Sequence, residues 1–159
     1  MAAEYKTNVM RILDKLKIPY KSHCYVDFDV ISGIDTARVL NQNPEKVFKT
    51  LVTVSKSGKN YVFMIPVAQE LDLKKAAESV GEKAVEMLKA KDLLPLTGYI
   101  HGGCSPVGMK KPFPTVIDQS ASQWDTLLCS AGKIGYQIEL SLEDLKKAVP
   151  LKLFSLVQI

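Results

Sequence analysis

Little in this sequence points to secretion or to a membrane. Its 159 residues include three cysteines, which lie far apart and form no Cys-x-x-Cys pair, so we expect reduced thiols and no disulfide framework. The start, Met1-Ala2-Ala3-Glu4-Tyr5, lacks the basic residues and the apolar run of a signal peptide. No run approaches the roughly 18 consecutive apolar residues of a transmembrane helix, so we expect a cytoplasmic protein.

The sequence also lacks the common motifs of cofactor and metal sites. Neither the P-loop pattern G-x-x-x-x-G-K-[ST] nor the dinucleotide fingerprint G-x-G-x-x-G occurs. His101 and Cys104 could supply two metal ligands, but no zinc signature matches their spacing to His23, Cys24 or Cys129. We therefore expect no metal and no cofactor.

Length and composition predict one globular domain that spans residues 1–159. The content of 47% hydrophobic and 24% charged residues is ordinary for a folded soluble protein. The net charge is +4. Residues 1–60 hold ten basic and six acidic residues, whereas residues 61–159 hold eleven of each, so the excess of basic residues lies in the first part of the chain. This asymmetry indicates either a mild attraction for a polyanion or an ordinary solvated surface.

Apolar periodicity and turn residues predict a mixture of helices and strands. Helices are predicted over residues 5–17, 34–40, 73–80 and 141–148. Strands are predicted over residues 20–26, 47–54, 61–67, 115–118, 126–129, 136–140 and 151–157. Ser32 or Asp35 is expected to cap the second helix, and shorter elements are expected after Asn43-Pro44, near Val85 and after Lys91. Because helices and strands do not alternate regularly, the pattern favours a mixed or antiparallel sheet in an α/β or α+β fold.

One lysine interrupts an apolar strand. In the run Val47–Val54, Lys49 shares a face with Leu51 and Thr53, where an ammonium is unfavourable unless something holds it or uses it. One interpretation is a lysine at a strand edge whose charge reaches water or discourages edge pairing. The other is an ammonium at the mouth of a pocket, where it binds a phosphate or stabilises a developing oxyanion.

Two glycine-rich segments, residues 97–109 and 130–135, could surround such a charge. Glycine lets the backbone come close to a ligand and direct N–H groups toward it. Ordinary turn-rich connections have the same composition, so both interpretations stay open.

The chain has few candidates for a nucleophile. Ser130 would need a base, and neither His23 nor His101 lies in a recognisable triad motif. Cys24 or Cys104 could act with a histidine, although small buried cysteines are the more common explanation for such residues.

A series of short motifs runs in a specific order from residue 6 to residue 157. The motifs are Ile18-Pro19-Tyr20, His23, Tyr25, Phe48-Lys49-Thr50-Leu51, Leu71-Asp72-Leu73-Lys74-Lys75-Ala76-Ala77, Val85-Glu86-Met87, Thr97-Gly98-Tyr99, Gly102-Gly103, Ser105-Pro106, Gly108, Lys110-Lys111 and Ser130…Gly132-Lys133. Together they closely resemble the YbaK/EbsC family, whose best-known members are Cys-tRNA(Pro) deacylases. More distantly, they resemble the editing domain inserted in bacterial prolyl-tRNA synthetases.

This resemblance implies a mixed six- or seven-stranded sheet or partial barrel flanked by helices, with a metal-free pocket. It implies that Lys49 is the essential catalytic lysine. The further substrate-binding positions that it implies are Tyr25, Thr50, Gly102, Gly103, Ser130 and Gly132. Three positions that bear on selectivity differ from the residues usual in the family, namely Ser32, Ala131 and Gln137.

The resemblance implies an aminoacyl-tRNA deacylase that acts in trans in translation fidelity and removes cysteine from misacylated Cys-tRNA(Pro). The family suggests that the thiol of the substrate itself attacks the ester carbonyl, and attack by a bound water is the alternative. Association with prolyl-tRNA synthetase is a further expectation. The alternative functions are a deacylase of another misacylated tRNA, such as Ala-tRNA(Pro), and a non-catalytic module that binds a nucleotide or an amino acid.

Overall fold

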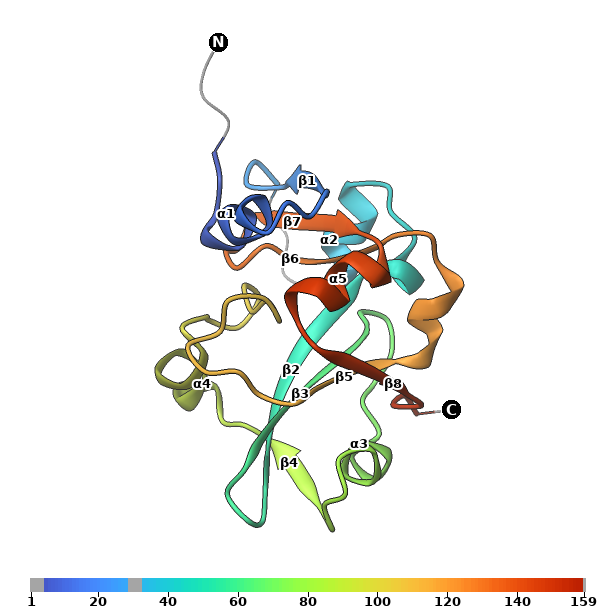
Figure 1. Cartoon of the computed structure of the whole chain (residues 1–159). Coiled ribbons are helices and arrows are strands. Elements are labelled where there is room, and N and C mark those ends of the chain that lie inside the picture. The colour runs from blue at the N-terminus through green and yellow to red at the C-terminus, as the bar shows by residue number, and fades with distance from the viewer. Residues whose placement is uncertain (1–4, 29–32, 159) are drawn as a thin grey trace.

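The computed structural model describes residues 5–28 and 33–158, which form a mixed α/β fold (Figure 1). The helices are α1 (Asn8–Lys15), α2 (Gly33–Val39), α3 (Leu73–Ser79), α4 (Ala90–Thr97) and α5 (Leu142–Ala148), with short 3₁₀ helices at Pro44–Lys46 and Gln119–Gln123. The strands are β1 (Lys21–Cys24), β2 (Phe48–Ser55), β3 (Asn60–Pro66), β4 (Val85–Met87), β5 (Thr115–Asp118), β6 (Leu127–Ser130), β7 (Tyr136–Leu140) and β8 (Leu151–Phe154).

The strands form two sheets. The three-stranded sheet has the order β1-β7-β6 and is antiparallel, and the five-stranded sheet has the order β4-β2-β3-β5-β8. A parallel bridge between Val47 and Leu128 joins the start of β2 to β6 and so connects the sheets. The predicted mixed fold class is confirmed, with eight strands in the described residues instead of six or seven.

Polar side chains fix where several helices begin. The Thr7 hydroxyl accepts a hydrogen bond from the Met10 N–H at 3.2 Å, so α1 begins at Asn8 and not at residue 5 as predicted. The helix also ends earlier than predicted, because Lys17 adopts a left-handed backbone conformation with φ of 59°. Asp72 and Ser141 cap α3 and α5 in the same way as Thr7. The predicted cap at Ser32 lies outside the described residues.

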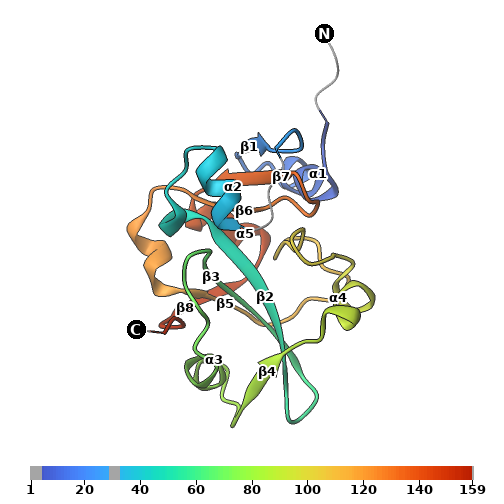
Figure 2. The ribbon, with the colours of Figure 1, turned by 180° about the vertical axis from the view of Figure 1, so that it is seen from behind.

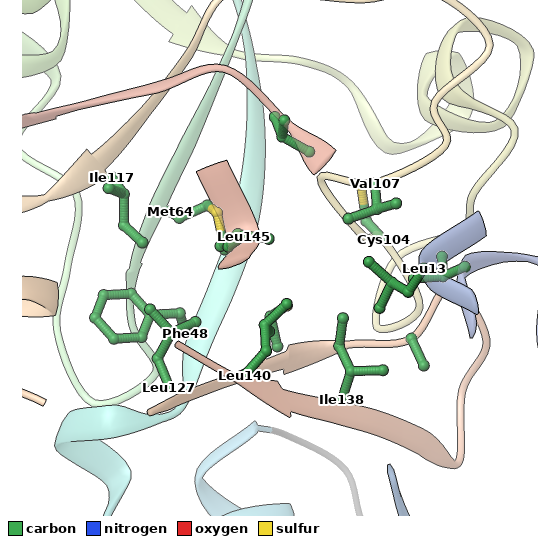
Figure 3. Packing of buried hydrophobic residues seen from close by; sticks show 14 of the residues in the cluster. Leu13, Phe48, Met64, Cys104, Val107, Ile117, Leu127, Ile138, Leu140 and Leu145 are labelled. Atoms are coloured by element: carbon green, nitrogen blue, oxygen red, sulfur yellow. The ribbon is translucent and has the colours of Figure 1, made fainter. Parts of the chain in front are cut away.

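The main hydrophobic core lies between the sheets, α1 and α5 (Figure 3). Each of these elements contributes fully or almost fully buried side chains, among them Leu13, Phe48, Met64, Ile117, Leu127, Ile138 and Leu145. Cys104 and Val107 bring the first glycine-rich segment into the same core. This segment is therefore anchored from within, although it contains no regular helix or strand after α4.

Smaller clusters cover the other face of the sheets. Under α2, the side chains of Ala37, Val47, Val67 and Leu128 pack together. Beside α3, a second cluster includes Phe63 and Ile65 of β3. Figure 2 shows α2 above the start of β2, and α3 toward the opposite end of β2. The part of β2 that carries Lys49 lies between these two apolar clusters.

Candidate active site

Lys49 lies on the outer face of β2. Phe48 and Val52 point into the main core, and because side chains alternate along a strand, Lys49 points to the opposite face, where its partner across β3 is Ile65. The side chain is half-buried and forms no hydrogen bond or ion pair with any residue that the structure describes. The predicted interruption of an apolar face by an ammonium is therefore present in the fold.

The strand register aligns Lys49 with polar residues from three other strands. Since Val47 pairs with Leu128 in parallel, Lys49 lies two residues further along β2, at the level of Ser130 in β6. Ser130 pairs with Gln137 of β7, and Gln137 pairs with His23 of β1. We call Lys49, Ser130, Gln137 and His23 the polar row.

The side chains of the polar row share one face of the sheets, because residues adjacent to them in sequence are buried in the main core on the opposite face. Cys129 and Ile138, adjacent in sequence to Ser130 and Gln137, belong to the main core. Leu128, two residues before Ser130, packs with Val47 under α2. The face that carries the polar row is therefore the face that α2 covers in part.

The two glycine-rich segments, distant in sequence, meet at the end of β6. A Cβ atom added to Gly103 would lie 3.1 Å from the backbone nitrogen of Ile134, and one added to Gly102 would lie 3.7 Å from the Ile134 side chain. Position 103 therefore tolerates no side chain without a backbone shift. The structure thus brings Gly102 and Gly103 against residues 133–134 of the second glycine-rich segment, which also contains Ser130 and Gly132.

Hydrogen bonds decide which backbone donors are available. The Gly132 N–H donates to the Ser130 hydroxyl at 3.1 Å, and the Gly103 N–H donates to the Ile100 carbonyl at 3.0 Å. The Gly102 N–H, by contrast, donates to no atom of the described residues. Of these three glycines, only Gly102 has its N–H free for a ligand.

Ala131, one of the three positions that differ from the usual family residues, has an ordinary backbone conformation. The left-handed residue of the second glycine-rich segment is Gly132, with φ of 89°, whereas Ala131 does not have a positive φ. Ala131 is buried, and its N–H donates to the Tyr136 carbonyl at 3.0 Å. Alanine is therefore accommodated here without strain.

Tyr25 and Thr50 lie in different surroundings. Tyr25 follows β1, is buried, and donates its N–H to the Gly135 carbonyl at 2.7 Å, which places it beside the second glycine-rich segment. Thr50 is next to Lys49 in sequence but points to the opposite face of β2, opposite Met64. Its hydroxyl is buried without a hydrogen-bond partner. The structure thus separates Thr50 from the polar row.

Two members of the polar row, Gln137 and His23, form side-chain interactions that were not predicted. Gln137 is 4% exposed, and its side-chain oxygen accepts a hydrogen bond from the Gln42 amide at 2.8 Å. Glu139, two residues further along β7, contacts the His23 ring at 2.8 Å and the Thr126 hydroxyl at 2.6 Å. The alternation of polar and apolar residues in β7 was the available signal for Gln137 and Glu139.

The Glu139 carboxylate is held in its charged form. Burial by itself would raise its pKa, but hydrogen bonds from Thr126 and His23, together with the positive charge of Lys46, outweigh burial and lower the pKa below its ordinary value. Lys46 lies at 3.5 Å from a carboxylate oxygen. Glu139 is therefore an anion with its own partners, two residues along β7 from Gln137 of the polar row.

The structure argues against two of the three thiols of the protein, Cys104 and Cys129, as the nucleophile. Burial raises the pKa of Cys104 and of Cys129 to about 12, so both are protonated thiols at neutral pH. Cys24 is exposed. Within residues 5–28 and 33–158, no three histidine, cysteine or acidic side chains gather in a way that would hold a metal ion.

Two cavities lie away from Lys49. One, of about 600 Å³, opens between α1 and β1 and reaches the polar row only at His23. The other, of about 860 Å³, lies beside α3 and β8. Neither cavity is lined by Lys49, and the alignment of polar side chains is what marks this site.

Comparisons with known proteins give consistent similarities. A model of the aminoacyl-tRNA editing domain matches residues 30–148. The chain is 48% identical over 141 residues to a protein of Enterococcus faecalis (strain ATCC 700802 / V583) named "Putative Cys-tRNA(Pro)/Cys-tRNA(Cys) deacylase EbsC", covering 88% of this chain and 86% of that protein.

Solved structures share the fold. One, titled "Crystal structure of a putative trans-editing enzyme for prolyl tRNA synthetase", has a TM-score of 0.82 at 20% identity and covers 98% of this chain and 100% of its own. Another, of a hypothetical protein, has a TM-score of 0.85 at 20% identity over 94% and 99% of the two chains. In the described part of the chain, no helix has the length and apolar character needed to cross a membrane.

Proposed function

The chain belongs to the aminoacyl-tRNA editing domain family, and we propose that it is a deacylase that removes cysteine from misacylated Cys-tRNA(Pro) in trans. The observation that carries this proposal is the 48% identity to EbsC, whose name gives this substrate, over 88% of the chain. The whole chain, residues 1–159, would act as one domain in the cytoplasm, where aminoacyl-tRNA is used. Prolyl-tRNA synthetase is the proposed partner.

In this proposal Lys49 is the catalytic residue. Its ammonium has no partner among the described residues, so it is available to bind the terminal phosphate or to stabilise charge in the transition state. Tyr25 and the hydroxyl of Ser130 would line the site, and Thr50, on the opposite face of β2, would act only through the position of the strand.

The Gly102 N–H is the proposed donor to the developing oxyanion. It is unbonded, and it belongs to a segment that is anchored in the core by Cys104 and Val107, so it is held in place before the substrate arrives. A single donor of this kind is typically worth ~3–4 kcal/mol in the transition state. An aminoacyl ester is already activated, so modest help of this size suits the reaction. Gly103 and Gly132 would shape the loops rather than donate.

We propose that the thiol of the substrate supplies the nucleophile. Its sulfur bonds to the ester carbonyl carbon, the bond to the ribose oxygen breaks, and that oxygen takes up the thiol proton as the tRNA leaves. The buried, protonated state of Cys104 and Cys129 supports this route, because neither can provide a thiolate at neutral pH.

The test is deacylation of labelled Cys-tRNA(Pro) by Lys49→Ala beside Lys56→Ala, a control in the exposed turn after β2. We expect Lys49→Ala to lose activity with an unchanged circular dichroism spectrum, and Lys56→Ala to keep it. Full activity of Lys49→Ala would refute the assignment.

A panel of substrates separates the alternatives. Seryl-tRNA(Pro), in which a hydroxyl replaces the thiol, should react much more slowly than the cysteinyl ester, and equal rates would indicate attack by water. Faster release of alanine from Ala-tRNA(Pro) would reassign the substrate. No turnover of any aminoacyl-tRNA would favour a non-catalytic binding module.

A further inference from the structure

The excess of basic over acidic residues in the described chain comes from three segments. Residues 5–28 hold five basic and two acidic side chains, and residues 98–112 and 130–136 add three lysines and no acidic residue. The rest of the described chain holds thirteen basic and thirteen acidic residues and is therefore neutral. The excess expected from residues 1–60 thus extends to both glycine-rich segments.

These three segments pack against one another. A Cβ added to Gly108 would lie 2.7 Å from the Ile12 side chain of α1, and one added to Gly132 would lie 2.8 Å from Val9 of α1. Figures 1 and 2 both show α1, the chain that follows α4 and the turn between β6 and β7 on the same side of the molecule. We call the surface of residues 5–28, 98–112 and 130–136 the basic surface.

Most of the cations on this surface have no partner. The side chains of six of them are exposed and form no hydrogen bond or ion pair with a described residue: Arg11, Lys15, Lys17, Lys21, Lys110 and Lys111. Lys6, by contrast, contacts Asp14 at 2.5 Å. Unpaired cations in excess of nearby anions create a positive potential that attracts a polyanion.

The basic surface also carries an exposed aromatic side chain. Tyr5 is 50% exposed, and its ring centroid lies 4.8 Å from that of Tyr136. The Lys133 ammonium lies 4.8 Å from the centre of the Tyr5 ring and 3.1 Å from its hydroxyl. Aromatic rings interleaved with cations are typical of sites for single-stranded nucleic acid, where bases stack on the rings and cations bind the backbone.

The aromatic pair is adjacent to the second glycine-rich segment, on the face of β7 that is opposite to the polar row. Tyr136 immediately precedes Gln137 of the polar row, and its N–H donates to the Lys133 carbonyl at 3.2 Å. An unpaired strand that stacks on Tyr5 would therefore end close to the second glycine-rich segment, which also contacts Gly102 and Gly103.

We propose that the basic surface binds the phosphodiester backbone of an RNA acceptor arm, and that Tyr5 stacks on an unpaired base near its 3′ end. This inference rests on the proposed function, because it names the surface that brings the esterified 3′ end to the glycine-rich segments of the proposed site. Recognition is by backbone charge and stacking, so the surface accepts the acceptor arms of different tRNAs. Selectivity for the substrate is then left to the aminoacyl group.

The first experiment compares two triple charge reversals in binding to an uncharged RNA hairpin with a single-stranded 3′ end, followed by fluorescence anisotropy over a range of salt concentrations. One is Arg11→Glu, Lys15→Glu and Lys111→Glu on the basic surface. The matched control is Lys56→Glu, Lys83→Glu and Lys152→Glu, which are exposed lysines outside it.

We expect the basic-surface triple to weaken binding at least tenfold and to reduce the slope of log K against log salt by about 2, since each lost phosphate contact removes about 0.7–0.9 from it. The control triple, with the same change in net charge, should keep the slope. Equal losses in both triples would overturn the proposal, because they would show an effect of net charge alone.

The second experiment addresses Tyr5. Tyr5→Ala should weaken binding of the single-stranded 3′ end about tenfold, whereas Tyr5→Phe, which keeps the ring, should bind like the parent protein. Equal binding by Tyr5→Ala would refute stacking. Because the RNA is uncharged, these results do not depend on catalysis, so loss of the deacylase assignment and loss of the basic surface are distinguishable outcomes.

Discussion

Replacement of Gly132 by alanine tests whether the second glycine-rich segment is fixed by its contact with α1. Gly132 has φ of 89°, and an added Cβ would lie 2.8 Å from Val9 and 3.0 Å from Tyr99, both of which belong to the main core. The left-handed conformation costs an alanine about 1–2 kcal/mol, and overpacking of a core costs about 1–3 kcal/mol more. We therefore expect Gly132→Ala to lower the free energy of unfolding by about 2–5 kcal/mol.

Gly58→Ala is the matched control for the backbone contribution. Gly58 has φ of 85°, close to that of Gly132, but an added Cβ would meet no atom within 4 Å. Its substitution should lower the free energy of unfolding by about 1–2 kcal/mol, from backbone strain alone. The difference between the two variants therefore isolates the steric clash with Val9 and Tyr99.

Urea unfolding, followed by the fluorescence of the single tryptophan, Trp124, measures both variants, because this side chain packs against the main core. At about 2–4 °C per kcal/mol for a chain of this size, the melting temperature of Gly132→Ala should fall by about 4–20 °C. Equal losses of stability in the two variants would refute the reasoning, because they would show that the contact with α1 has no energetic effect.

Three further predictions concern stability and reactivity. Since the folded pKa of Glu139 is lowered, its contribution to stability is present above its ordinary pKa of 4.5 and is lost as the pH falls through the folded value; acid titration of Glu139→Gln should lack this part of the loss, and an unchanged acid profile would contradict it. Asp72→Ala removes hydrogen bonds to two N–H groups of α3 and should cost about 1 kcal/mol in urea unfolding, whereas Asp72→Asn should cost less. A thiol reagent should modify Cys24 quickly in the native protein, and Cys104 and Cys129 only after denaturation; rapid reaction of all three would show that the two buried thiols are accessible.

Local patterns predicted most of the elements correctly. The strands at 115–118 and 136–140 have the predicted bounds, because short β-branched and aromatic runs end there at polar or helix-capping residues. The predicted helices over residues 73–80 and 141–148 are present and are capped by Asp72 and Ser141, since capping depends on a few adjacent residues. α4 extends over Ala90–Thr97 and is longer than the predicted turn after Lys91. It contains Pro95, a residue that local rules disfavour inside a helix.

Strand pairing was beyond the reach of local patterns. β3 pairs with β5 in parallel and β5 pairs with β8 in parallel, which requires partners that are distant in sequence. The polar row depends on such pairings, because the bridge between Val47 and Leu128 sets Lys49 level with Ser130. Lys49 and Ser130 could be named individually from the sequence, but their alignment could not be derived from spacing.

The charges around the polar row support the proposed role of Lys49. Its neighbours in the row, Ser130 and Gln137, carry no charge, and the Gln137 amide is held by Gln42. Two strand spacings, roughly 10 Å, separate the backbones of Lys49 and Gln137, a distance that two long side chains can bridge. A carboxylate at position 137 would therefore attract the Lys49 ammonium, and the attraction between opposite charges is strong where water is partly excluded. The neutral glutamine leaves that ammonium without a counter-ion among residues 5–28 and 33–158, and Glu139, the next outward-facing acidic residue of β7, is already engaged by its own partners. An anionic substrate is then the group that completes the site.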